Sequence, residues 1–332
     1  MNKRSSLWIS WENHRRTKEL ASNLPSVELC ILEFCGAKII RYPYLLSKTL
    51  LLLLKKRPDV IFVQSPSIVL ALFMVTMGKY FTRFIIVDAH NEGLRPFSNK
   101  LDWLLPLYRF IQRQSYLTIV TNEELGKEVE NNGGRPFVLQ DKIPHVTCHK
   151  RISLKGRSNI VFICTFEKDE PYEEVIKAAS IIDASTVIYI TGNKQKAQRE
   201  IIEKASQNIV FTGFIPESEY FNLLYSCDAI MDLTLMENCL VCGAYEAVAM
   251  NKPIILSDTK ALREYFNIGA VFTKSDAESI ANAISIITRD REYLERDVQI
   301  LEKNLLADWH KRKQSLICFL DLVNSETEKK KS

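Results

Sequence analysis

The sequence predicts an α/β protein built from two doubly wound domains that face each other across a cleft. At 332 residues the chain exceeds the size at which a single hydrophobic core stops growing, so two domains are expected. Short β-rich runs alternate with longer helical stretches, a pattern typical of a parallel sheet with helices on both faces. The alternation breaks down once, between Gln140 and Arg157, and then restarts.

The first half of the chain contains five predicted strands with helices between them. Runs such as DVIFVQS and FIIVDAH are continuously apolar, as strands buried on both faces are. The leucine-rich helix is predicted to end at Arg57-Pro58, and a short helix from Glu123 is predicted to end at Gly133-Gly134. The predicted strands are Leu7–Trp11, Val27–Leu32, Asp59–Ser65, Phe84–His90 and Tyr116–Asn122.

The polar stretch Gln140–Arg157, with Pro144 and Gly156, is predicted to be an interdomain linker. The chain then ends in a long charged helical tail from Asp276 to Lys331. We therefore expect an N-terminal domain at 1–150 and a C-terminal domain at 151–307. The strands predicted in the second half are Asn159–Phe166, Thr186–Asn193, Asn208–Phe214, Ala229–Thr234, Pro253–Asp258 and Ala270–Thr273.

Composition places few limits on function. The formal net charge of +4 is too small to indicate nucleic-acid binding, although it is compatible with an anionic ligand or membrane surface. Eight cysteines are spread through apolar surroundings, as in a cytosolic protein with reduced thiols. Cys239 and Cys242 form one CxxC, but no second pair or neighbouring histidine completes a zinc site. We expect both to be small packing residues on a helix.

No apolar run is long enough to span a membrane, but two predicted helices are unusually apolar. They cover Tyr44–Lys56 and Ser67–Phe81. The first ends in Lys55 and Lys56, and Arg57 follows it. A helix of this kind suits an anionic bilayer surface. Ordinary core helices of an α/β sheet explain both runs at least as well.

The common loops of doubly wound enzymes are absent from the sequence. No GxGxxG follows the first strand, and no GxxxxGK[ST], GxSxG or HExxH occurs. Dinucleotide dehydrogenases, P-loop enzymes, hydrolases of the nucleophile-elbow type and HExxH metalloproteases are therefore not indicated.

Polar residues instead gather where the predicted strands end, as expected of a ligand-binding cleft in an open α/β fold. In the first half these are Glu12, His14, Arg15, Arg16, Ser65, Asp88, His90 and Asn91. In the second half they are Thr165, Phe166, Lys168, Asp169, Glu170, Thr191–Asn193, Thr212–Phe214 and Glu237–Glu246.

Segments of the second half resemble a known family. TFEKDEPYEEVIKAA, YITGN, NIVFTGFIPESEYFNLLYSCDAIMDLT and ENCLVCGAYEAVAMNKPIILSD occur in the order found in nucleotide-sugar-dependent glycosyltransferases of the GT-B architecture, which has two Rossmann-like domains. The chain most resembles glycosyltransferase family 4, called group 1. TFxxDEP and VDAHN also resemble segments of β-mannosyltransferases that extend lipid-linked chitobiose. Family 4 implies retention at the anomeric centre, whereas the second likeness implies inversion.

The resemblance implies a donor site at two glutamates. In the family the first acid supports the reacting face and the second binds the ribose hydroxyls, with the helix N-terminus between them facing the diphosphate. Here these positions fall on Glu237 and Glu246, with Val241, Cys242 and Gly243 at the helix start. Eight residues separate the acids instead of seven, and on a helix one extra residue rotates a side chain by about 100°. The Glu246 prediction is the firmer one.

Other donor-site residues are implied by the loops after three strands. Relatives carry an Arg and a Lys after the first strand of this domain, but here TFEKDEP, which begins at Thr165-Phe166, offers only Lys168. Either Lys168 suffices with the helix dipole, or a cation such as Arg15 or Arg95 comes from the first domain. Gly192 is expected near the diphosphate or base, and Phe214-Ile215 near the nucleobase. A plain turn explains each glycine equally well.

The first domain is predicted to bind the acceptor. The resemblance places His90 at the acceptor side, where a neutral imidazole could orient or deprotonate the hydroxyl, with Asp88 as its partner or as the base. The second group, Glu12, His14, Arg15 and Arg16, opens the first helix. Two arginines at a helix N-terminus form a candidate site for the diphosphate of a lipid-linked acceptor. A solvated basic turn is the alternative.

Together these features predict a metal-independent hexosyltransferase that uses a nucleoside diphosphate sugar as co-substrate and no further cofactor. The acceptor is expected to be a lipid-linked oligosaccharide for surface polysaccharide or glycoconjugate assembly. We expect a cytoplasmic protein, with peripheral contact at the inner face of the plasma membrane. The last helix, at about 308–330 around Trp309, is expected to pack on the first domain. The alternatives are a nucleotide-sugar 2-epimerase and a catalytically silent scaffold subunit.

Overall fold

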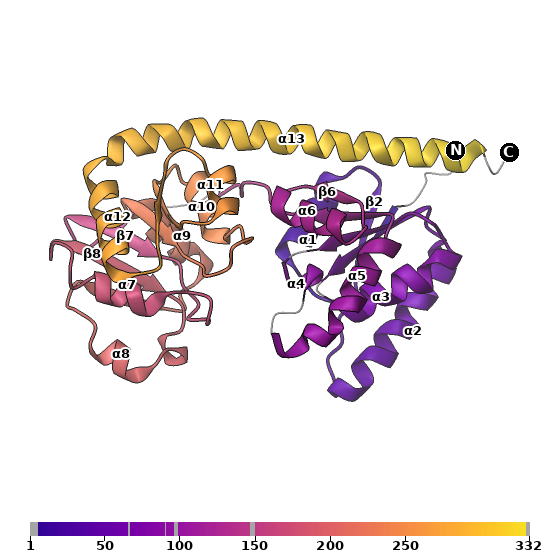
Figure 1. Cartoon of the computed structure of the whole chain (residues 1–332), viewed down its shortest axis with the longest axis horizontal. Helices are drawn as coiled ribbons and strands as arrows, with labels where there is room; N and C mark the ends of the chain where they lie inside the picture. Colours follow the sequence, from indigo (N-terminus) through magenta and orange to yellow (C-terminus); the bar gives the residue numbers. More distant parts are fainter. Residues whose placement is uncertain (1–5, 66, 90, 96–98, 147–149, 330–332) are drawn as a thin grey trace. The chain divides into compact units, whose positions relative to one another are not determined.

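The computed structural model describes residues 6–65, 67–89, 91–95, 99–146 and 150–329. The chain divides into two compact units (Figure 1). Unit 1 comprises Met1–Asp141 together with Trp309–Ser332, and unit 2 comprises Lys142–Asp308.

Unit 1 is a parallel sheet in the order β2-β1-β3-β4-β5-β6, with helices on both faces. Its strands are β1 (Ser6–Ser10), β2 (Val27–Ile31), β3 (Val60–Ser65), β4 (Ile85–Ala89), β5 (Leu117–Val120) and β6 (Pro136–Val138). Its helices are α1 (Arg15–Asn23), α2 (Lys38–Lys56), α3 (Ile68–Thr76), α4 (Asn91–Leu94), α5 (Leu105–Gln114) and α6 (Glu123–Asn131), with 3₁₀ turns η1 (Gly78–Tyr80) and η2 (Asn99–Leu104).

Alternation along the strands of unit 1 builds a core on each face of the sheet. Leu7 and Ile9 of β1 face the core shared with α2, α3, α5 and α6, whereas Trp8 faces the core shared with α1 and α13. Successive side chains of a strand point to opposite faces, so a sheet covered on both sides needs continuously apolar strands. Trp8 stacks on Phe62 of β3 in the second of these cores.

Unit 2 repeats this plan with the sheet order β12-β11-β10-β7-β8-β9, again all parallel. Its strands are β7 (Ser158–Phe162), β8 (Thr186–Thr191), β9 (Ile209–Gly213), β10 (Ala229–Asp232), β11 (Ile254–Ser257) and β12 (Ala270–Thr273). Its helices are α7 (Tyr172–Ala178), η3 (Lys194–Lys196), α8 (Arg199–Glu203), α9 (Glu217–Ser226), α10 (Cys242–Ala249), α11 (Lys260–Tyr265) and α12 (Ala277–Arg289).

The last helix, α13 (Arg291–Lys329), is continuous and contributes to both units (Figure 1). Val298, Leu301 and Leu305 are buried in the core of unit 2 with α9, α10 and α11. Trp309 and Leu316 are buried against β1 and β3 in unit 1. The Trp309 indole N–H also donates to the carbonyl of Gln140 at 3.2 Å. This hydrogen bond joins α13 to the last residues of the first segment of unit 1, which ends at Asp141.

All eleven predicted strands are present, and one short strand was not predicted. β6 has three residues and begins with Pro136, so it has neither the length nor the alternation that marks a strand in sequence. It pairs with β5 at the edge of the sheet, where a missing proline N–H is tolerated. The predicted CxxC helix is also corrected, because Cys239 lies in a loop and Cys242 is the exposed first residue of α10.

Among the described residues, no helix combines the length and the apolar character needed to cross a membrane.

Replacing Trp309 with alanine is expected to destabilise unit 1, because a buried indole and its hydrogen bond to Gln140 are both lost. A loss of about 3–5 kcal/mol is typical of a buried Trp→Ala change. Hydrogen exchange of the β1 and β3 amides would measure it locally. Tyr293→Ala, at an exposed aromatic on the same helix, is the control. Equal exchange in both variants would contradict this role for Trp309.

Candidate functional site

The carboxyl ends of β10, β7, β8 and β9 lie side by side at one edge of the unit 2 sheet, because these strands are parallel neighbours. The loop after β7 is ordered there by Glu170. Its carboxylate accepts hydrogen bonds from the backbone N–H of Thr165 at 2.9 Å and from the N–H of Glu167 at 3.0 Å. The Thr165 hydroxyl donates to the same carboxylate. Lys168, in this ordered loop, is exposed.

Phe166, predicted to be a donor-site residue, turns its side chain into the core. Its backbone is in the left-handed region, at φ 60°, and its ring is buried in the core beside Tyr172, with 5.3 Å between ring centroids. That conformation is uncommon for a residue other than glycine, and the packing of the ring stabilises it. Only the backbone of Phe166 can therefore face a ligand.

Gly192 brings the end of β8 against the loop after β7. Its φ is 84°, and a Cβ added there would lie 2.2 Å from the carbonyl oxygen of Cys164. Only glycine fits both the conformation and the contact. The next strand ends in the same way at Gly213, which has φ 70°, and it is followed by Phe214, whose side chain is 94% exposed. Ile215 packs against the core.

A buried hydrogen bond joins the start of α10 to the end of β10. The Gly243 N–H donates to the Asp232 carboxylate at 2.7 Å. A Cβ on residue 243 would lie 2.5 Å from that carboxylate and 2.5 Å from the Ile163 side chain. The absence of a side chain at Gly243 thus lets the helix N-terminus sit directly on the strand end.

Asp232 is a buried acid at this edge, and its pKa is strongly shifted. Burial raises its pKa well above the ordinary carboxyl value, and the negative charges of Glu170, Glu246 and Asp169 raise it further. The hydrogen bond from Gly243 acts in the opposite direction, because it favours the ionised form. The acids therefore influence one another across the strand ends. Within the described ranges, however, no group of three or more His, Cys, Asp or Glu residues is arranged to hold a metal ion.

Glu246 lies one turn into α10 and is held by a tyrosine of α9. The Tyr220 hydroxyl donates to its carboxylate at 2.5 Å. Burial and the negative charge of Glu246 both raise the pKa of Tyr220, so the phenol stays protonated and remains a donor. The half-buried carboxylate is thus oriented and can still accept further hydrogen bonds, as carboxylates have several lone-pair positions.

Glu237 lies in an exposed turn, and the helix starts only at Cys242. The residues between Glu237 and Cys242 are not helical. The extra residue in the spacing to Glu246 is therefore accommodated in a loop, and the rotation expected for an insertion within a helix does not occur. The structure does not bring Glu237 into any hydrogen bond that fixes its carboxylate among the described residues.

In unit 1, Arg16 and Asp88 have a partnership that the sequence did not predict. The Arg16 guanidinium is buried, donates to Asp88 at 3.1 Å and to Asp141 at 2.6 Å, and also donates to the carbonyl of Leu139. Burial alone would lower the Arg16 pKa, but the two carboxylates more than offset this and raise it. The structure thus corrects one prediction, because Arg16 is not exposed for an acceptor anion. Asp88 is the ion-pair partner of Arg16, and its acceptor-side role stays a prediction.

The remaining acceptor-side residues are divided. Glu12 is exposed and forms an ion pair with Arg41 of α2 at 3.1 Å, so it links the loop after β1 to that helix. His14 and Arg15 are exposed at the start of α1. The predicted acceptor histidine, His90, lies outside the described residues.

Three site residues were missed because their importance depends on contacts between distant segments. Asp232 was visible only as the acid within AIMDLT, and Tyr220 as an aromatic at the start of a helix. Gln64 is the next-to-last residue of β3 and is buried, where it accepts a hydrogen bond from the Ser10 hydroxyl. Each is a polar residue at the end of an element in an apolar setting, the only signal in the sequence that could have identified it.

Comparison with known families identifies the second unit. Residues 157–290 match the family described as "Glycosyl transferases group 1". This range contains β7 to α12 and therefore all of the donor-side residues described above. The second unit is thus a group 1 glycosyltransferase domain. No curated protein matches the chain.

Solved structures resemble the chain over nearly its full length. Sucrose-phosphate synthase from Thermosynechococcus elongatus is 13% identical, with a TM-score of 0.74, and the match covers 97% of this chain and 100% of that one. HepE from Anabaena, in complex with UDP and glucose, is 13% identical, with a TM-score of 0.70 and coverage of 96% and 99%. A UDP-N-acetylglucosamine 2-epimerase from Listeria monocytogenes, described as putative, is 12% identical, with a TM-score of 0.61 and coverage of 89% and 90%.

These likenesses show the fold, which is GT-B with two Rossmann-like units. The predicted fold class is therefore confirmed, and the match of residues 157–290 agrees with the predicted group 1 likeness of the second unit. The closer assignment to family 4 and the likeness to β-mannosyltransferases stay predictions, as do the roles of individual site residues.

Replacing Gly243 with alanine is expected to displace the start of α10, because the new Cβ would overlap the Asp232 carboxylate and Ile163. Overpacking of this kind costs about 1–3 kcal/mol. Thermal unfolding should show the loss, and titration with nucleoside diphosphate should show weaker binding. Ala244→Gly, which changes the neighbouring residue in the opposite direction, controls for helix propensity. If Gly243→Ala binds nucleoside diphosphate as the wild type does, the Gly243–Asp232 contact is not needed for the donor site.

Asp232→Asn is expected to change how stability depends on pH. Because the folded-state pKa is raised, the folded protein binds this proton more tightly than the unfolded chain. The stabilisation is full below the ordinary carboxyl pKa and is lost as pH rises towards the raised value. Asparagine cannot titrate, so the difference in unfolding free energy between the wild type and the variant should fall with rising pH. Denaturant unfolding from about pH 4 to about pH 8 measures it. A pH-independent difference would contradict the buried titration.

Proposed function

We propose that the protein transfers a hexose from a nucleoside diphosphate sugar to a hydroxyl group. The observation that carries the proposal is the Tyr220–Glu246 pair beside the anchored start of α10, within the group 1 glycosyltransferase domain. An oriented carboxylate one turn into a helix can accept hydrogen bonds from both hydroxyls of a ribose, while the start of the helix faces the diphosphate.

The donor diphosphate requires positive charge beyond the helix dipole. Two N–H groups at the start of α10 are already used, because Gly243 donates to Asp232 and Ala244 donates to the carbonyl of Val241. The remaining dipole is equivalent to about half a charge, which does not neutralise a diphosphate. We assign the additional charge to Lys168, which is exposed in the ordered loop after β7.

The nature of the donor is supported by the structural neighbours. HepE has been crystallised with UDP, with UDP and glucose, and with UDP-glucose. A uridine diphosphate hexose is therefore the first donor to test. Phe214, exposed after the positive-φ Gly213, is placed on the loop expected to face the nucleobase.

The acceptor is proposed to be lipid-linked and reached at the cytoplasmic face of a membrane. Unit 1 has 25 Lys and Arg against 16 Asp and Glu, whereas unit 2 has 19 against 24, so the basic character lies in the acceptor unit. The residues 38–57 contain six cations and no acid. An anionic membrane surface attracts such a segment.

The outer face of α2 suits that surface. Ile40, Tyr44, Leu51 and Leu54 are exposed, whereas Leu45, Thr49 and Leu53 face the core. The exposed apolar residues recur at the helical period and have Lys48 and Lys55 beside them. A second copy of the chain would place two strongly cationic helices against each other, so charge favours an anionic lipid as the partner.

Two alternatives have support of their own. The structural likeness to a 2-epimerase is compatible with a free sugar product. The exposed Glu237 and the single loop cation are compatible with a catalytically silent subunit. Incubating the protein with radiolabelled donor and membrane lipid extract separates the three. Label in lipid supports the transferase, a soluble epimer supports the epimerase, and no turnover by folded protein supports the silent subunit.

Leu51→Asp should reduce transfer to lipid in vesicles without changing donor affinity.

Glu246→Ala is expected to weaken nucleotide-sugar binding by at least about tenfold, since a charge-assisted hydrogen bond contributes about 1.5–3 kcal/mol. Tyr220→Phe keeps the carboxylate but removes its anchor, so a smaller loss is expected. Calorimetric titration measures both. Glu264→Ala, at an exposed helical glutamate in the same unit, is the matched control. If Glu246→Ala binds the donor as the wild type does, the donor-site assignment is wrong.

A further inference from the structure

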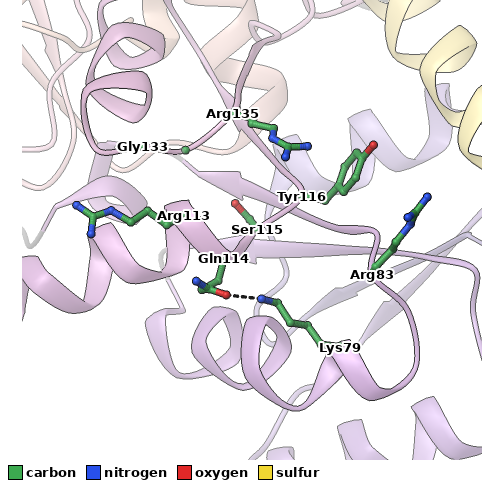
Figure 2. A pocket seen from close by; sticks show the side chains of 9 residues that line it. Lys79, Arg83, Arg113, Gln114, Ser115, Tyr116, Gly133 and Arg135 are labelled. Atoms are coloured by element: carbon green, nitrogen blue, oxygen red, sulfur yellow. Dashed lines mark hydrogen bonds between the residues drawn. The ribbon is translucent and has the colours of Figure 1, made fainter.

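A depression of about 390 Å³ lies on unit 1, and its lining includes none of the predicted acceptor-side residues. Its walls carry four cationic side chains, from η1, the connection into β4, the end of α5 and the residue before β6. Figure 2 shows Lys79 paired with Gln114, while Tyr116 and Arg135 lie on the other side of Ser115. The lining residues are Lys79, Arg83, Arg113, Gln114, Ser115, Tyr116, Gly133, Gly134 and Arg135.

The depression is at the opposite edge of the sheet from the acceptor-side residues. Arg83 precedes β4, Tyr116 precedes β5 and Arg135 directly precedes β6, so the depression lies at the amino ends of these strands. Asp88 and Asn122 mark the carboxyl ends of β4 and β5. Because the strands are parallel, their amino ends and their carboxyl ends are separated by the length of the strands. This is a second location, separate from the glycosyltransferase site.

The charge of the depression is not balanced from within. Among the residues that the structure describes, its lining has four cations and no carboxylate. The groups that hold three of these cations are neutral. Lys79 donates to the Gln114 amide, Arg113 donates through Nε to the Asn132 carbonyl at 2.6 Å, and Arg135 lies over the Tyr116 ring. An anion that enters therefore relieves repulsion among the like charges of Lys79, Arg113 and Arg135.

Helix ends explain only part of this arrangement. Cations are favoured in the last turn of a helix, which accounts for Arg113 and, at the end of a 3₁₀ turn, for Lys79. Arg83 and Arg135 are in no helix. The turn before Arg135 is shaped by Gly133, at φ 81°, and by Gly134, where a Cβ would lie 2.9 Å from the Gln112 carbonyl oxygen. These glycines bring Arg135 close to the end of α5.

We propose that this depression binds a phosphate-bearing anion. Guanidinium groups match phosphate oxygens in pairs, and an ammonium adds a mobile point charge. The volume lies in the range of small-ligand sites, large enough for more than one phosphate group. Such a ligand could be a soluble polyphosphorylated molecule or the headgroup of an anionic lipid. Met77 and the 83% exposed Tyr80, on either side of Lys79, would suit the second source.

The test uses the full-length protein and two probes, inorganic tripolyphosphate and vesicles of phosphatidylglycerol with phosphatidylcholine. The double variant Arg113→Gln/Arg135→Gln removes two cations from the depression. Its matched control, Arg199→Gln/Arg296→Gln, removes two exposed cations from unit 2 and has the same net charge. Calorimetry measures tripolyphosphate binding, and co-sedimentation measures vesicle binding. Binding at any other site cancels in the comparison of the two doubles.

The depression variant is expected to bind at least about tenfold more weakly than its control to one of the probes, as expected when charge-assisted contacts are removed. A loss confined to tripolyphosphate identifies a soluble ligand, and a loss confined to vesicles identifies a lipid headgroup. Equal binding by the two doubles to both probes overturns the proposal. Arg135→Glu alone, which leaves the Arg113–Asn132 contact intact, gives the same comparison if the double variant unfolds. Donor turnover is not used, so the result is independent of the proposed function.

Discussion

The hydrogen bond from Gly243 to Asp232 is the contact on which the donor-side architecture depends. It joins the end of β10 to the start of α10 inside the core, where a carboxylate without a partner would be costly to bury. The helix N-terminus offers Asp232 both an N–H and a favourable dipole. Because no side chain stands at residue 243, α10 is close enough for Glu246 to meet the Tyr220 hydroxyl.

The same contact limits what the helix can offer a ligand. Its start already faces an acid, and two of its N–H groups are used within the protein. Negative charge also comes from Asp169 and Glu170, in the loop after β7, and from Glu246 on α10, so this edge is acidic before any ligand arrives. A bound diphosphate would need cations from the ligand-facing loops. The basic excess of unit 1 contrasts with this edge, which gives the two units different electrostatic roles.

In unit 1 a buried ion pair replaces the surface site that the sequence suggested. Arg16 and Asp88 are separated by 72 residues, yet they meet because β1 and β4 both end at the same edge of the sheet. A buried guanidinium must have compensating charge, and Asp88 and Asp141 provide it. Sequence patterns show that an arginine opens a helix, but they do not show which way its side chain turns.

The sequence by itself determined the layout of the fold. Continuous apolar runs of four to eight residues, with turns between them, mark buried parallel strands, and this local periodicity needs no knowledge of distant segments. Among the described strands, only β6 was not predicted, because it is too short to show a period. Glu246 stood out through the segment around it, and its donor role is still a prediction. The tertiary structure decided the contacts between residues that are distant in sequence. These are the Asp232–Gly243 contact, the Tyr220–Glu246 hydrogen bond and the burial of the Arg16 side chain against Asp88. Burial and electrostatic partners arise only when segments distant in sequence are brought together.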